Sequence, residues 1–371
     1  MPEHALLDAI QRGMADPSDM MGAILSLPEQ CERARQIAMD ADLTALRERT
    51  IRNVVIAGLG GSAIGGDLLR TIYESELRVP VLISRDYHIP GFVNSDTLVI
   101  AASYSGNTEE TLASYQRARK LKAPIIAITT GGALADHARE DGVPVVRIPS
   151  GLQPRAAVGY SFVPLVVAAC RLDLMPASLL DDLDDLIAAL NSVRDACNPD
   201  APQARNRAKQ LAAGWVGKIP VVYGSGGVRG VIAYRWKCQI NENAKAYGVW
   251  NVLPELDHNE SVGWSGAREQ PRLESALSVV FLRDEREPEQ LRLRVELTKQ
   301  IVEKHAASVS DVWPVGDSGI ARAMSLLHVG DFASCYLAYA YGEDPTPVKA
   351  IDWLKAELAR ASRHSLSTGQ S

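Results

Sequence analysis

The sequence has few of the residues that build disulfide frameworks and metal centres. Its 371 residues include five cysteines, an odd number, which lie far apart and form no C-x-x-C pair. This spacing predicts neither a disulfide framework nor a zinc knuckle, and we interpret the cysteines as buried small hydrophobic residues. The seven histidines lack H-x-H and H-E-x-x-H spacing, which are the usual signs of a zinc hydrolase or a metal-dependent isomerase. We therefore expect neither a metal nor a cofactor.

The chain also lacks a strong charge of one sign and a long hydrophobic run. Its formal net charge is −6, and lysine and arginine are scattered, so the sequence has no electrostatic footprint for nucleic acid. The longest apolar stretches, 54–66 and 156–170, are too short or too rich in glycine to span a bilayer, and the acidic start is no signal peptide. We expect a cytoplasmic protein that binds neither nucleic acid nor membrane.

Hydrophobic spacing divides the chain into several segments. A length of 371 residues exceeds the ~250–300 at which a single core stops growing, so two domains are expected. From residue 51 onward, short apolar runs alternate with helical segments, which predicts an α/β fold with doubly wound parallel sheets. The predicted segments are a helical lead-in (1–50), a first subdomain (51–150), a helical linker layer (151–217), a second subdomain (218–345), a C-terminal helix (346–362) and a disordered tail (363–371).

The second subdomain repeats the opening of the first. The segment 220–227 (PVVYGSGG) resembles 54–61 (VVIAGLGG), and each predicts a strand that runs into a glycine-rich turn and a helix. The second copy continues with a predicted strand at 277–282 and a predicted helix at 320–328, and the similarity indicates an internal duplication. A serine-rich turn follows the predicted strand 97–102 of the first copy, whereas Arg283 and Asp284 follow the corresponding strand of the second. We therefore expect only the first copy to hold phosphate.

Two turns of the first copy are suited to that anion. The loop 58–66 (GLGGSAIGG) permits close approach of a ligand to the N–H groups of a helix, but it also fits the G-x-G-x-x-A form of a nicotinamide-binding fold, with Asp86 for the ribose. The turn 103–108 (SYSGNT) is more specific, because its hydroxyls, its amides and the helix dipole can bind a dianion without lysine or arginine. The alternative is a helix N-cap completed by residues 109–111.

The order of these motifs resembles a known family. S-x-S-G-N-T-x-E-T after a G-G-S turn is similar to the sugar isomerase (SIS) domain, and more closely to the bifunctional phosphoglucose/phosphomannose isomerases. The resemblance covers nearly the whole chain, because P-R-A-A at 154–157, N-E-N-A-K at 241–245 and H-N-E at 258–260 follow in the family's order. It implies two SIS-type, flavodoxin-like subdomains in a homodimeric enzyme of glycolysis and gluconeogenesis.

The resemblance also implies roles for individual residues. The phosphate of a sugar phosphate would be bound by Gly61, Ser62, Ser103, Ser105 and Thr108. Catalysis would use Glu242 as the base, Arg155 beside the reacting carbons, and His258 and Lys355 for opening the sugar ring. In relatives the histidine comes from the partner subunit, which implies the same for His258.

The chemistry of an aldose–ketose interchange independently requires residues of these types. A proton must move between adjacent carbons through an enediolate, and one carboxylate can shuttle it. Desolvation raises the pKa of a glutamate from ~4.3 and makes it a better base, and general-base catalysis contributes roughly 10²–10⁴ in rate. An arginine offsets charge on the enediolate, and a histidine with an ordinary pKa of ~6.5 suits ring opening. We therefore predict a metal-independent interconversion of glucose 6-phosphate and mannose 6-phosphate with fructose 6-phosphate.

The same residues have other interpretations. Glu242 lies off the centre of an apolar helical stripe and His258 lies in a polar loop, so each could be a solvated surface residue. Arg155 could be a surface residue or a carbonyl clamp. Lys355 shares a predicted helical face with Val348 and could lay its stem along that face.

One position departs from the family pattern. Val348 stands seven residues before Lys355, where dual-specificity members are expected to carry a threonine that makes room at C2 of the sugar. The departure weakens the prediction for mannose 6-phosphate relative to glucose 6-phosphate. The rival functions are a non-catalytic phosphosugar-binding protein, a nicotinamide-dependent oxidoreductase and an SIS isomerase of another phosphosugar.

Overall fold

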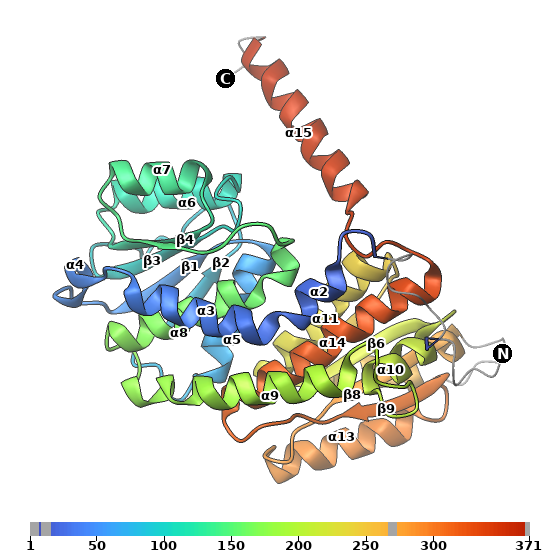
Figure 1. Ribbon diagram of the computed structural model, residues 1–371. Coiled ribbons are helices and arrows are strands. Elements are labelled where there is room, and N and C mark those ends of the chain that lie inside the picture. The colour runs from blue at the N-terminus through green and yellow to red at the C-terminus, as the bar shows by residue number, and fades with distance from the viewer. Residues whose placement is uncertain (1–6, 9–15, 266–272, 368–371) are drawn as a thin grey trace.

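Two parallel sheets joined by helices make up the fold (Figure 1). The computed structural model describes residues 7–8, 16–265 and 273–367. The first sheet has the order β2-β1-β3-β4-β5 and the second the order β7-β6-β8-β9. The strands are β1 (Asn53–Ala57), β2 (Val81–Ser84), β3 (Thr97–Ala102), β4 (Ile125–Thr129), β5 (Val145–Arg147), β6 (Ile219–Ser225), β7 (Val249–Leu253), β8 (Leu277–Leu282) and β9 (Ser308–Val312). The predicted α/β class with two parallel sheets is confirmed.

Helices cover both faces of the first sheet. Apolar residues of β1, β3 and β4 alternate between the two faces, as the period of a strand dictates. One face packs against α3 (Leu27–Asp40), α5 (Gly60–Ile72) and α8 (Val158–Arg171). The other packs against α6 (Glu109–Lys120) and α7 (Gly132–Glu140). Because helices cover both faces of the sheet, the carboxyl ends of its strands form the open edge of this layer.

The second sheet has the same layered arrangement. Its inner face packs against α9 (Asp182–Cys197), α10 (Arg207–Trp215), α11 (Val228–Ala244) and α14 (Gly319–Tyr341). Its outer face packs against α12 (Glu260–Ser265) and α13 (Glu289–Val302). The inner helices of both sheets share one hydrophobic cluster, so a continuous core joins the two halves. The remaining elements are α2 (Met20–Leu25), α4 (Thr44–Arg47), η2 (Pro154–Ala156), η3 (Ala177–Leu180), η4 (Glu255–His258), η5 (Leu273–Ala276) and α15 (Lys349–Ser367).

Two elements near the C-terminus differ from the sequence-based prediction. Helix α14 was predicted to end at residue 328 but continues to Tyr341, because its last turns are almost entirely buried and so lack the alternation of buried and exposed faces that marks a helix. Helix α15 continues to Ser367, beyond the predicted C-terminal helix (346–362) and into the segment predicted as a disordered tail (363–371); residues 368–371 lie outside the described chain. In Figure 1, α15 projects away from both sheets.

Candidate active site

Hydroxyl groups converge where the first sheet reverses its strand order. β1 and β3 are neighbours whose following segments lead to opposite faces, and ligands bind at such switch points in doubly wound folds. The Ser103 and Thr108 hydroxyls lie 2.8 Å apart in the turn after β3, and the Tyr104 N–H donates to the Ser62 hydroxyl at 3.2 Å. We call the turn 103–108 together with Ser62 the hydroxyl cup; Ser105 carries its exposed hydroxyl.

The alternative interpretation of the turn as a helix N-cap is wrong for Thr108. Thr108 is the N-cap residue of α6, yet its hydroxyl contacts Ser103 instead of capping the helix. The first amides of α6 can therefore point at an anion, whose charge the helix dipole also favours. Gly106 makes the turn possible, because its φ is +71° and an added Cβ would lie 1.7 Å from the Gly131 carbonyl oxygen.

The loop that carries Arg155 packs directly on the cup. A Cβ added at Gly61 would lie 2.5 Å from the Pro154 carbonyl oxygen, so a glycine there lets η2 approach α5. The Leu152 N–H donates to the Tyr104 hydroxyl at 3.0 Å. These two contacts fix the start of η2 beside the turn that would hold phosphate.

Arg155 is a buried hub, with 5% of its surface exposed. Its Nε donates to Asn243 Oδ1 at 2.7 Å, and its Nη2 donates to the carbonyl oxygens of Pro345 and Thr346, both at 2.7 Å. Its Nη1 lies 3.6 Å from Glu242 Oε2. Burial lowers the pKa of the guanidinium, although Glu242 opposes this shift. The carbonyl-clamp interpretation is therefore confirmed for one edge of the guanidinium, while another edge faces Glu242.

Glu242 lies on the wall of a cavity of about 570 Å³. It belongs to the last turn of α11, and one third of its side chain is exposed. The cavity is lined from α11 by Cys238 and Lys245, and from the C-terminal segment by Val348 and Ile351. A carboxylate here can meet a ligand without being fully solvated. Cys238 is half-buried, whereas the other four cysteines are buried as predicted.

Lys355 does not contact this cavity wall. It is exposed on α15, one helical turn beyond Ile351 and on the same face. Ile351 lines the cavity, so Lys355 stands above its rim. The position of Val348 on the wall agrees with the idea that this side chain faces a bound sugar.

His258 and Glu242 lie toward opposite ends of the strands of the second sheet. Leu253 at the end of β7 is paired with Ser225 at the end of β6, and α11 starts three residues after Ser225. His258 follows β7 in η4 and is therefore near the start of α11, whereas Glu242 is near its end. At 1.5 Å per residue these ends are about 20 Å apart.

Several residues important to the site were missed by sequence reasoning. Glu260 of the H-N-E motif accepts hydrogen bonds from Tyr223 and Asn251, and so anchors the loop of His258. Lys245 donates to the carbonyl oxygens of Asp344 at 2.6 Å and Pro345 at 2.9 Å. Burial lowers the pKa of this lysine. The spacing within N-E-N-A-K was the available signal, because it places several polar groups at one helix end.

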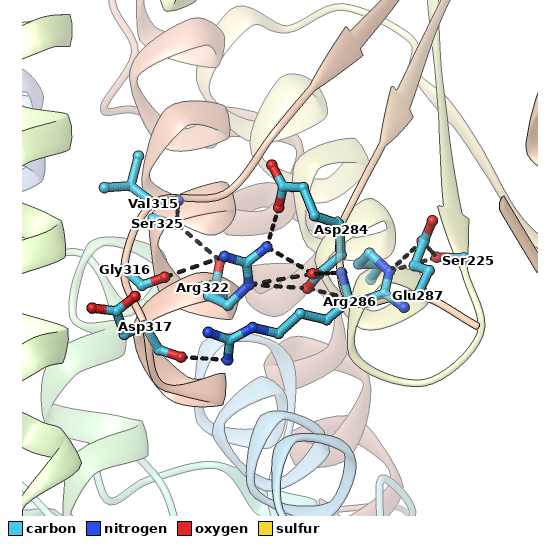
Figure 2. A network of polar contacts seen from close by, with 11 residues as sticks. Ser225, Asp284, Arg286, Glu287, Val315, Gly316, Asp317, Arg322 and Ser325 are labelled. Atoms are coloured by element: carbon cyan, nitrogen blue, oxygen red, sulfur yellow. Dashed lines mark hydrogen bonds and ion pairs between the residues drawn. The ribbon is translucent and has the colours of Figure 1, made fainter. Parts of the chain in front are cut away.

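Ion pairs fill the corresponding switch point of the second sheet (Figure 2). Arg322 pairs with Asp284 at 2.7 Å, and Arg229 pairs with Asp284 at 3.3 Å and with Glu287 at 2.9 Å. Ser225, at the end of β6, also binds Glu287. The protein's own carboxylates thus satisfy the arginines at this position, which supports the prediction that phosphate binds only to the first copy.

Residues 7–8, 16–265 and 273–367 contain no cluster of three or more His, Cys, Asp or Glu side chains with metal-binding geometry. Within the same ranges, no helix has the length and apolar character needed to cross a membrane.

Two family models match the chain. The SIS domain model matches residues 49–146, and the model of the bacterial phospho-glucose isomerase C-terminal SIS domain matches residues 204–358. Fold and hydroxyl cup therefore define a protein with two SIS domains. The C-terminal domain of glucosamine-fructose-6-phosphate aminotransferase from Francisella tularensis shares this fold, with a TM-score of 0.69 and 16% identity over 88% of this chain and 98% of that one.

Curated relatives narrow the class to one family. A bifunctional phosphoglucose/phosphomannose isomerase of Caldicellulosiruptor bescii is 44% identical over 92% of this chain and 99% of its own length. Another, of Thermoplasma acidophilum, is 39% identical over 85% of this chain and 92% of its own length. The chain belongs to the bifunctional phosphoglucose/phosphomannose isomerase family, as the order of its motifs predicted.

Proposed function

We propose that the protein interconverts glucose 6-phosphate and mannose 6-phosphate with fructose 6-phosphate, through an enediolate and without a metal ion. The observation that carries the proposal is the contact of Arg155 with Glu242. Glu242 lines the cavity, and Arg155 belongs to the loop that packs against the hydroxyl cup. The two relatives described above are named bifunctional phosphoglucose/phosphomannose isomerases, and this supports the same reaction. Location in the cytoplasm and a role in glycolysis and gluconeogenesis stay predictions.

In this proposal Glu242 is the base and Arg155 stabilises the intermediate. Glu242 takes a proton from one carbon and returns it to the neighbouring carbon, which one carboxylate can do when both carbons lie within its reach. Negative charge then develops on the enediolate oxygens. The Nη1 edge of Arg155, which faces Glu242, is the donor available to meet that charge.

The hydroxyl cup holds the phosphate of the same sugar. Hydroxyls and backbone N–H groups surround the switch point, and they come from Gly61, Ser62, Ser103, Ser105 and Thr108. These neutral donors and the N-terminus of α6 can bind a dianion without a cationic side chain. Binding the phosphate there would fix the reacting carbons relative to Arg155.

Ring opening requires an acid–base group that Glu242 does not replace, and we assign it to His258 of a second subunit together with Lys355. The two ends of α11, which are about 20 Å apart, separate the Glu242 side of the helix from the loop of His258, and this supports the assignment. Large apolar side chains on α15, including Trp353 at 65% and Leu358 at 55% exposure, also favour a covering partner. We therefore propose a homodimer in which His258 is donated across the interface.

A coupled assay tests the proposed reaction. Purified protein with EDTA is given fructose 6-phosphate, and glucose 6-phosphate and mannose 6-phosphate are measured separately. We expect both products, and we expect Glu242→Gln to lower the rate roughly 10²–10⁴-fold. Glu32→Gln, an identical change at an exposed position on α3, serves as the matched control.

Each possible failure has a separate meaning. Full turnover by Glu242→Gln would remove Glu242 as the base. Loss of activity in EDTA that added metal restores would overturn metal independence. Sugar phosphate binding without any turnover in the unmodified protein would favour the non-catalytic alternative.

A further inference from the structure

A stripe of polar side chains is buried between α11 and α14. Arg235, Gln239 and Asn243 lie four residues apart on one face of α11, and their exposures are 4%, 1% and 0%. Asp331 and Ser334 face them from α14, with exposures of 3% and 0%. The surrounding helix–helix contact is apolar. We call these five side chains the polar stripe.

The polar stripe is hydrogen-bonded along its length. Arg235 Nη2 donates to both carboxylate oxygens of Asp331, at 3.0 and 2.8 Å, and Gln239 Nε2 donates to Asp331 Oδ1 at 2.9 Å. Asn243 Nδ2 donates to the Ser334 hydroxyl at 2.9 Å. Buried ion pairs of this kind are often no more stabilising than apolar residues of the same volume. Stability alone therefore does not account for the stripe.

Both ends of the polar stripe contact Arg155. Arg235 Nη2 donates to the Arg155 carbonyl oxygen at 2.9 Å and so fixes the backbone. Asn243 Oδ1 accepts from Arg155 Nε at 2.7 Å and so fixes the side chain. Asn243 is adjacent to Glu242 in sequence, but its side chain points into the helix interface, whereas Glu242 points to the cavity.

The contacts of Arg155 determine which edge of its guanidinium faces Glu242. A guanidinium carries five N–H donors. Asn243 accepts the Nε donor, and the carbonyl oxygens of Pro345 and Thr346 accept from Nη2. The Nη1 group is the one that faces Glu242. Rotation about the side chain would exchange these edges, and the acceptor at Nε opposes that rotation.

We propose that Asn243 is a positioning residue of the isomerase reaction. It holds the guanidinium so that Nη1 meets the enediolate oxygens, and it does so without touching the substrate. The inference rests on the proposed function. Because phosphate is held by the hydroxyl cup, loss of Asn243 lowers kcat and leaves KM nearly unchanged.

The test compares Asn243→Leu with Asn243→Asp. The leucine variant keeps the shape and removes the acceptor, and we expect kcat to fall about 10²-fold, the scale of a small misplacement of a catalytic group. The aspartate variant keeps an acceptor for Arg155 Nε and recovers most of kcat. Both variants are assayed with fructose 6-phosphate at a temperature at which circular dichroism finds them folded. Asn243→Ala, which opens space instead of filling it, replaces the leucine variant if that one does not fold.

Asn206→Ala is the matched control. Asn206 is also fully buried, and its side chain accepts from Lys209 N at the start of α10, away from the cavity. This variant should lose stability but keep kcat. If Asn243→Leu or Asn243→Ala left kcat unchanged, the inference would be overturned while the proposed function stood. The same holds if the variant raised KM in proportion to its loss of kcat. An unmodified protein without isomerase activity would overturn both.

Discussion

Ser105 is the member of the hydroxyl cup that is most open to a ligand. Its side chain is exposed, and its hydroxyl oxygen accepts from Asn107 N at 3.3 Å, so its own proton is available to an incoming phosphate. Ser103 and Thr108 instead contact each other at 2.8 Å and shape the turn. Substitution of Ser105 therefore removes a ligand contact with little effect on the turn.

We predict that Ser105→Ala raises KM for fructose 6-phosphate and leaves kcat nearly unchanged. A hydrogen bond to a charged group contributes about 1.5–3 kcal/mol, which corresponds to about 10–150-fold in KM. Steady-state kinetics measure the effect, and Ser178→Ala at an exposed position of η3 is the control. An unchanged KM would exclude Ser105 from the phosphate site.

Val348 is the residue at which substrate preference can be tested. Its side chain lines the same cavity as Glu242. Threonine has nearly the shape of valine but carries a hydroxyl that can bind a hydroxyl of the sugar. We predict that Val348→Thr raises the ratio of kcat/KM for mannose 6-phosphate to that for glucose 6-phosphate, measured in parallel assays. An unchanged ratio would show that this wall does not face C2.

At the scale of elements, helix α14 buries a histidine within an apolar layer. His328 Nε2 lies 2.9 Å from the Ile24 carbonyl oxygen, and its ring packs 4.7 Å from that of Phe332. Burial lowers the pKa of His328 to about 4, so this side chain is neutral in the folded protein at pH 7. Protonation of the unfolded chain, whose histidine has an ordinary pKa of ~6.5, opposes folding in acid.

We predict that this histidine makes the protein sensitive to acid. The folded pKa is below the unfolded value, so the stabilising contribution is complete above pH ~6.5 and is lost as pH falls toward 4, by about 3 kcal/mol in all. Urea unfolding at pH 7 and pH 4.5 should therefore differ less in His328→Gln than in the unmodified protein. His88→Gln, at an exposed position, should not reduce the difference. Equal acid sensitivity in all three would contradict the prediction.

Elements with a clear hydrophobic pattern were predictable from the sequence, and elements without one were not. β8 lies at residues 277–282 as predicted, because a short β-branched run is bounded by polar residues. β7 was missed, because its pattern mixes Trp250 and Asn251 and it forms an edge of the sheet. α14 was predicted too short, because a helix buried on all sides carries no amphipathic signal.

At the scale of the whole molecule, the proposed dimer, in which Glu242 and His258 of one site come from different chains, makes activity depend on two chains. We predict that Glu242→Gln and His258→Asn are each strongly impaired as homodimers. When equal amounts are dissociated and reassociated together, half of the dimers are mixed, and one site of each mixed dimer carries neither change. Activity should then return to about a quarter of that of the unmodified protein.

The reassociation experiment has a clear negative outcome. If both residues acted within one chain, every site of a mixed dimer would carry one change, and activity would not return. The control mixes Glu242→Gln with Arg155→Lys, two changes whose side chains lie 3.6 Å apart in the same chain, and should show no recovery. Recovery in that control would indicate exchange of whole segments between subunits.

Sequence predicted the chemical groups of the site better than their placement. The turn 103–108 of the hydroxyl cup was predictable, because its residues are consecutive and follow one strand. The hub formed by Arg155 was not, because Asn243, Pro345 and Thr346 reach it from distant parts of the chain through tertiary packing. The position of His258 relative to Glu242 required the pairing of β6 with β7, which sequence reasoning had missed.

The polar stripe sets a limit on engineering this enzyme for heat resistance. Replacing Arg235, Gln239 and Asp331 with apolar residues of equal volume removes a buried ion pair, and such replacements are often neutral or raise stability by 1–4 kcal/mol. A selection that scores only melting temperature would accept them. The selected variants would be stable proteins in which Arg155 is held less firmly. Libraries that leave these positions unchanged should therefore yield more active catalysts.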